Sequence, residues 1–114
     1  MISCNINLYI LIFNKQKLIY ELISDSDQQL SIPYCELTSE AKIHDVLEKI
    51  FKDYVDLETF YTNFILADLV NNDILNINYF CLVPYATNIK KGHLIPIKND
   101  KVYSPAIQKI VAKL

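Results

Sequence analysis

The chain opens with apolar runs that are typical of β-strands. The segment NINLYILIF is rich in Ile, Leu and Tyr, and the polar turn NKQK separates it from a second run, KLIYELIS. A polar loop leads to the short segment LSIP, where Ile32 should be extended because a proline follows it. This part of the chain therefore predicts two strands, the first of them buried, and a short extended piece.

The spacing of apolar residues predicts a helix over about residues 40–55. Thr38 or Ser39 is the expected N-cap, because a hydroxyl oxygen accepts a hydrogen bond from a free N–H of the first turn. Apolar residues three and four positions apart form one continuous stripe: Ile43, Val46, Leu47, Ile50, Phe51 and Tyr54.

The second half predicts two long strands, an edge strand and a closing helix. ETFYTNFILADLV and ILNINYFCLVPY flank the turn signal NND. The second of these strands should be half exposed at its start and buried on both faces at its end. HLIPI is a short strand, and Pro96 indicates either a strand at a sheet edge or the end of a strand. Ser104 as N-cap and Pro105 at the first position begin a helix over about residues 104–114.

This order of elements predicts the α+β class, with helices packed on a mixed sheet. No linker or repeat interrupts residues 1–114, so we expect a single domain. A chain of 114 residues with 52% hydrophobic residues is long enough and apolar enough to bury a core without metal or disulfide help.

Charge and cysteine content narrow the expected partners. The net charge is −2 and the 11 basic residues are all Lys, so we expect no direct nucleic-acid binding by this chain. Three widely spaced cysteines without a C-x-x-C motif indicate neither zinc nor a disulfide framework and favour the reducing cytoplasm. The apolar start is too short to span a bilayer, so no membrane association is expected.

The segment SIPYCELTSEAKIHDVLEKIFKDYVDLE (31–58) combines an Ile-Pro step with the amphipathic helix. In this it resembles the box of the Nudix family, which begins near a Leu-Pro-Gly-Gly turn. The family's box continues into a helix with Arg-Glu-apolar-x-Glu-Glu-x-Gly-apolar, whose glutamates bind the Mg²⁺ that activates diphosphate hydrolysis. LETFYTNFILAD, LNINYFCLVPY and IPIKNDKVYSPAIQKIVAKL are similar to segments of the Nudix domain in Nudix-related transcriptional regulators. The resemblance implies a Nudix-like α/β/α sandwich.

The residues at the box positions depart from the family pattern. Lys49 takes the place of the arginine and Ile50 that of the first glutamate, while Asp53 and Tyr54 replace the paired glutamates. Isoleucine cannot bind a metal, and a tyrosine hydroxyl is neutral near pH 7. The resemblance therefore implies a catalytically degenerate domain with no catalytic or metal-binding residue. Asp53 and Glu40 are the weak candidates for Mg²⁺.

The ligand cleft that the resemblance implies lies around the box. We expect a regulatory module that binds a nucleotide-derived or sugar ligand there, or a dimerisation module, and we expect a homodimer. A DNA-binding domain beyond Leu114 would favour the regulator. The expected cleft residues are Tyr34, Glu36, Glu40, Lys49, Asp53 and Tyr54.

Two alternatives belong to other functional classes. The first is a divergent Mg²⁺-dependent hydrolase of nucleoside diphosphate derivatives; only in that case is a cofactor, Mg²⁺, expected. The second is a protein-interaction scaffold without a ligand, in which Tyr34 and Ile50 fill the cleft. The hydrolase would use Asp53 and Glu40, with Glu36 or Asp68.

Overall fold

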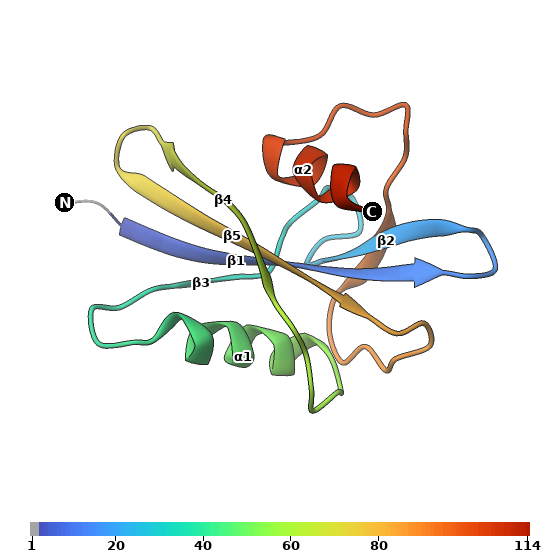
Figure 1. The fold of residues 1–114 in the computed structure, drawn as a ribbon, viewed down its shortest axis with the longest axis horizontal. Coiled ribbons are helices and arrows are strands. Elements are labelled where there is room, and N and C mark those ends of the chain that lie inside the picture. The colour runs from blue at the N-terminus through green and yellow to red at the C-terminus, as the bar shows by residue number, and fades with distance from the viewer. Residues whose placement is uncertain (1–2) are drawn as a thin grey trace.

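The computed structural model describes residues 3–114 and arranges them around one six-stranded mixed sheet (Figure 1). The strand order is β4-β5-β1-β2-β6, and β3 pairs with the first half of β1. β1 is parallel to β5 and antiparallel to β2 and β3. The elements are β1 (Ser3–Asn14), β2 (Ile19–Ser24), β3 (Tyr34–Glu36), α1 (Ile43–Tyr54), β4 (Asn63–Val70), β5 (Ile74–Val83), β6 (His93–Pro96) and α2 (Pro105–Lys113).

β1 is buried on both faces because it runs through the middle of the sheet. Its alternate residues enter two different cores: Ile6 and Leu8 belong to the core under α1, whereas Tyr9 and Leu11 belong to the core under α2. The two helices lie on opposite sides of the sheet (Figure 1). The structure thus confirms the predicted α+β class, the α/β/α sandwich and the buried first strand.

Helix α1 has the predicted apolar stripe but begins later than expected. Its N-cap is Lys42, whose side chain makes no capping hydrogen bond, so the prediction of Thr38 or Ser39 is wrong. The reason is a separate turn before the helix, in which the Ala41 N–H donates to the Thr38 carbonyl at 3.2 Å. At the other end of the chain, Ser104 does cap α2 and Pro105 is its first residue, as predicted.

The structure refines one prediction about the strands and corrects another. A strand follows the predicted extended piece around Ile32, because β3 begins at Tyr34. Pro33 has no N–H to donate to the ladder, although its carbonyl accepts from the Leu8 N–H at 3.0 Å. The end of β5 is not buried on both faces, because Leu82 is 52% exposed. β4 pairs only as far as Phe80, so Leu82 has no neighbour on that side.

The turns contain the residues with positive φ. Asn71 and Asn72, in the predicted NND turn, have φ of 54° and 61° and join β4 to β5. Gly92 has φ of +93° immediately before β6, the edge strand that ends at Pro96 as predicted. A Cβ on Gly92 would lie 3.0 Å from Ile23 Cγ2 and 3.1 Å from the Ser24 carbonyl oxygen. Glycine at this position is therefore required by both conformation and space.

Replacing Gly92 with alanine should destabilise the fold. We expect Gly92→Ala to lower the free energy of unfolding by about 1–3 kcal/mol, from strain in the left-handed region and the close approach to β2. Asn72→Gly is the control, because it relaxes a left-handed residue in an exposed turn. Urea unfolding followed by circular dichroism measures both. If Gly92→Ala unfolds at the same urea concentration as the parent protein, glycine is not required at this position.

Candidate functional site

The box helix α1 presents its polar residues to solvent and its apolar stripe to the sheet. Lys49 and Asp53 are exposed on the outer side of the helix, and Glu40 is exposed in the turn before it. Ile50, which the resemblance places at the position of a metal-binding glutamate, is only 3% exposed and belongs to the core. The inner side of α1 therefore contributes packing.

Tyr54, at the end of α1, anchors the helix to the loop after β2. The tyrosine is buried, and its hydroxyl donates a hydrogen bond of 2.5 Å to the Asp25 carboxylate. Burial raises the pKa of Tyr54 most, and the hydrogen bond and charge of Asp25 raise it further. The Lys91 ammonium lies 4.9 Å from the centre of the ring. These contacts hold Tyr54 in place as part of the fold.

Tyr34 and Glu36 project from the other face of the sheet. Tyr34 pairs with Asn7, and Glu36 pairs with Asn5. Directly paired residues of neighbouring strands share a face, and Asn7 faces the side of α2. Cys35, between them, packs against the core under α1. The structure therefore does not bring the six expected cleft residues together in one place.

Metal-binding residues do not cluster in the part of the chain that the structure describes. Within residues 3–114 there is no group of three or more His, Cys, Asp or Glu side chains placed to hold one ion together. No helix there is long and apolar enough to cross a membrane.

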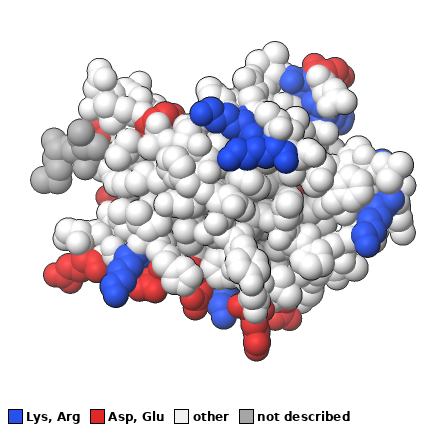
Figure 2. Space-filling view, in the orientation of Figure 1, with Lys and Arg blue, Asp and Glu red and all other residues white. Residues whose placement is uncertain are grey.

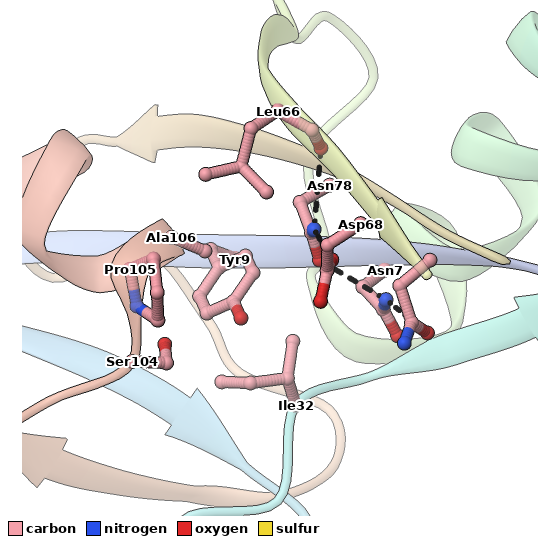
Figure 3. Close-up of a pocket in the computed structure, with 10 residues that line it drawn as sticks. Asn7, Tyr9, Ile32, Leu66, Asp68, Asn78, Ser104, Pro105 and Ala106 are labelled. Carbon is pink, nitrogen blue, oxygen red and sulfur yellow. Dashed lines mark hydrogen bonds between the residues drawn. The ribbon is translucent and has the colours of Figure 1, made fainter. Parts of the chain in front are cut away.

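A polar pocket opens instead on the α2 face, beside the start of that helix (Figure 3). The nine residues of α2 cover the end of the sheet around Leu11 and Phe80 and leave the preceding part of β1 and β5 uncovered. The cavity has a volume of about 300 Å³, and Ile32 and Leu66 supply apolar walls. We call it the amide pocket. Its polar residues are Asn7, Tyr9, Asp68, Asn76, Asn78 and Ser104.

Hydrogen bonds between three strands build the polar wall of the pocket. Asn78, buried on β5, donates from Nδ2 to the Leu66 carbonyl at 3.2 Å and to Asp68 Oδ1 at 3.1 Å, both on β4. Asn7 on β1 donates from its own Nδ2 to Asn76 Oδ1 and Asn78 Oδ1, each at 3.1 Å. A buried amide is costly unless it is bonded, and here the strands satisfy one another.

Hydroxyl groups form the opposite side of the pocket. Tyr9 is buried on β1, and burial raises the pKa of its phenol; a hydrogen bond with Ser104 opposes this and the charge of Asp68 adds to it. Ser104 caps α2 by accepting from the Ile107 N–H at 3.4 Å. The pocket thus combines one carboxylate, three amides and two hydroxyls, an arrangement suited to binding a ligand by hydrogen bonds.

This pocket is not among the sites that the sequence predicts. From the sequence, Asp68 is only an auxiliary acid of the hydrolase alternative, Asn76 and Asn78 are polar positions at a half-exposed strand start, and Asn5 and Asn7 only interrupt an apolar run. A signal was present, because Asn5 and Asn7 on one strand and Asn76 and Asn78 on another show the same two-residue spacing. Only the parallel pairing of β1 with β5 places these residues side by side on one face.

Comparison with known proteins identifies the fold. No family model matches the chain, and no curated protein sequence gives a significant match. Solved structures do match, among them a MutT/nudix family protein from Enterococcus faecalis, with a TM-score of 0.66 and 9% identity over 87% of this chain. The Nudix domain of Shewanella oneidensis NrtR, solved with ADP ribose, has a TM-score of 0.56 and 9% identity over 86% of this chain. The chain has the Nudix fold.

A third matching structure was solved in complex with another protein. The C-terminal domain of mouse MUTYH, solved in complex with human PCNA, gives a TM-score of 0.64 and 12% identity over 98% of this chain. The chain spans 45% of the Enterococcus structure, 71% of the Shewanella domain and 86% of the mouse domain. At these identities the likeness establishes the Nudix fold alone.

Placing a glutamate at position 50 should cost stability. We expect Ile50→Glu to lower the free energy of unfolding by about 3 kcal/mol or more, because it removes a buried side chain and places a charge in the core. The matched control is Lys49→Glu, which puts the same side chain on the exposed neighbour and should change stability by about 0.5 kcal/mol or less. Urea unfolding compares the two variants. Equal stabilities would mean that Ile50 is not a packing residue.

Proposed function

We propose that this Nudix-fold chain is a small-ligand-binding module whose ligand enters the amide pocket. The support for this proposal is the bonded network around Asn78, which holds polar groups in fixed positions next to the apolar walls of Ile32 and Leu66. Ligand sites in proteins usually have this composition, with a few placed polar groups among apolar ones. A regulatory role in the cytoplasm is part of the proposal.

The volume of the amide pocket limits what it holds. Ligand sites range from about 300 to 1,000 Å³, and this cavity, at about 300 Å³, lies at the small end. It suits one ring of a ligand, either the base of a nucleotide-derived molecule or a sugar, with the remainder outside. The NrtR domain solved with ADP ribose supports a nucleotide-derived ligand in this fold.

Ligand binding should stabilise the chain without Mg²⁺. We would follow thermal unfolding with ADP-ribose, NAD, nucleosides, nucleoside diphosphates and triphosphates, and simple sugars. A ligand at a hundred times its Kd adds about 2.7 kcal/mol. Asn7→Leu should abolish the shift, because it removes the amide that bonds both Asn76 and Asn78. The control is Asn5→Leu, which changes the same residue type on the same strand and face outside the pocket.

Other results of this screen would favour the alternatives. No shift with any compound would contradict the proposal and favour a protein-interaction scaffold, for which the mouse MUTYH domain solved with PCNA is a precedent in this fold. A shift that requires Mg²⁺ would favour the divergent hydrolase. Turnover by that enzyme should then be lost in Asp53→Asn, and turnover that persists in this variant would exclude Asp53 from the reaction.

A second role, dimerisation, is favoured by the free edge of β4. Charged side chains gather around this face of the molecule and leave its middle uncharged (Figure 2). Phe64 and Leu69 on β4 are 52% and 47% exposed, and the strand carries no Lys or Pro of the kind that protects edges. We propose a second copy of this chain as the occupant, because Asp68 is the only charged side chain of β4 and identical edge strands satisfy each other's free N–H and C=O groups.

The oligomeric state tests this role. We expect light scattering at micromolar concentration to give the mass of a dimer, and Leu69→Lys to give a monomer because it places a charge beside the shared edge. Leu94→Lys is the control, since Leu94 is an exposed leucine on β6 at the opposite edge. A monomeric parent protein would rule the interface out.

A further inference from the structure

We infer that the amide pocket selects ligands carrying two neighbouring N–H donors, such as an amidine-type N–C–N edge, and does not bind phosphate. The inference rests on the proposed function, since it concerns the ligand of the same pocket. It follows from counting which hydrogen-bonding groups of the pocket are already used within the protein.

The orientation of the amides follows from two groups that can only accept. The Leu66 carbonyl and the Asp68 carboxylate both lie next to one end of the Asn78 side chain, so this end must be the NH₂ group. The Asn78 oxygen then lies next to Asn7, which must donate to it from its own NH₂ group. The same NH₂ group reaches Asn76, so Asn76 presents its oxygen there. Each assignment forces the next.

The count leaves the polar wall rich in acceptors. An amide NH₂ has two N–H groups, and both are used in Asn78 and both in Asn7. The oxygens of Asn76 and Asn78 keep free lone pairs, and so does the Asp68 carboxylate, because each oxygen accepts more than one hydrogen bond. The donors that remain in the pocket are the NH₂ group of Asn76 and the hydroxyls of Tyr9 and Ser104, and the free lone pairs outnumber them. A ligand that faces the oxygens of this wall must therefore supply donors.

The carboxylate specifies how these donors are arranged. Asn78 holds one Asp68 oxygen, and the Asp68 side chain points into the cavity between Tyr9, Ile32 and Asn7 (Figure 3). A carboxylate binds best to two parallel N–H groups on one planar unit, at roughly twice the strength of neutral hydrogen bonds. Two kinds of molecule offer that edge: a base with adjacent amino and imino groups, as in guanine, and a guanidinium cation.

Phosphate lacks what this pocket requires. It presents oxygens to an acceptor-rich wall, and the lining residues include Asp68 but no lysine. The start of α2 supplies few free N–H groups that could bind the phosphate oxygens instead. Pro105 has no N–H and the Ile107 N–H is already bonded to Ser104, so of these first three residues only Ala106 has an N–H to offer. The phosphates of a nucleotide would therefore remain outside.

Paired probes, of which one has the N–C–N edge of donors and the other lacks it, test the inference. Guanosine and inosine differ by a single amino group, and methylguanidinium and methylammonium differ in the planar N–C–N edge. We would titrate each into the full chain and follow amide chemical shifts, which report even millimolar Kd values. Guanosine or methylguanidinium should bind about tenfold more tightly than its partner, and the pair that shows the difference identifies the source of the edge. Guanosine monophosphate should bind no more tightly than guanosine.

Asp68→Asn should remove this preference, because it replaces the free carboxylate by an amide of the same shape. Affinity for the preferred probe should fall about tenfold or more. Asp73→Asn makes the same change in the exposed turn outside the pocket and should have no effect. Urea unfolding of both variants would establish that they are folded.

Any of the following results would overturn the inference: equal binding within both pairs, tighter binding of the monophosphate than of guanosine, or unchanged affinity in Asp68→Asn. Absence of binding by every probe would also overturn it. The proposed function is judged separately by the wider ligand screen. A shift there that Asn7→Leu abolishes would retain the pocket as a binding site for a ligand of other chemistry.

Discussion

The pairing of β1 with β5 is the constraint on which the other features depend. The two strands run parallel over ten residue pairs, from Ser3 with Ile74 to Ile12 with Val83. Paired residues of neighbouring strands share a face, so this register aligns the apolar residues under α1 on one side. On the other side it aligns the asparagines. A shift of one residue would exchange the two faces and destroy both the core and the amide pocket.

The two faces of the sheet are covered in different ways. Under α1 the gap between helix and sheet is filled by apolar side chains, including Ile50 and Phe51. Helix α2 is short and covers only part of the other face. The part of that face beside the start of α2 is polar. Asn78 is buried there, and its side chain is hydrogen-bonded because β4 and β1 both supply partners. The proposed ligand site thus lies where helix packing ends and a bonded polar network takes its place.

The box segment keeps the shape that the resemblance implies and uses it for packing. Its helix is present with the expected stripe, and Tyr54 links the helix end to Asp25 in the loop after β2. The exposed residues Lys49 and Asp53 do not meet Tyr34 and Glu36, which project from the opposite face. The box helix thus packs on one face of the sheet, and the amide pocket lies on the opposite face.

The sequence by itself determined the class of the fold, both helices, the buried first strand and the edge position of β6. These features follow from local patterns: the helical stripe, the Ser104-Pro105 start and the position of Pro96. Only the tertiary structure decided the position of the pocket, because Asn7 and Asn78 are 71 residues apart and meet through strand pairing. It also decided that Leu82 is exposed, since this depends on where β4 begins. Periodicity indicates which face a side chain belongs to, but its neighbours on that face depend on register between distant strands.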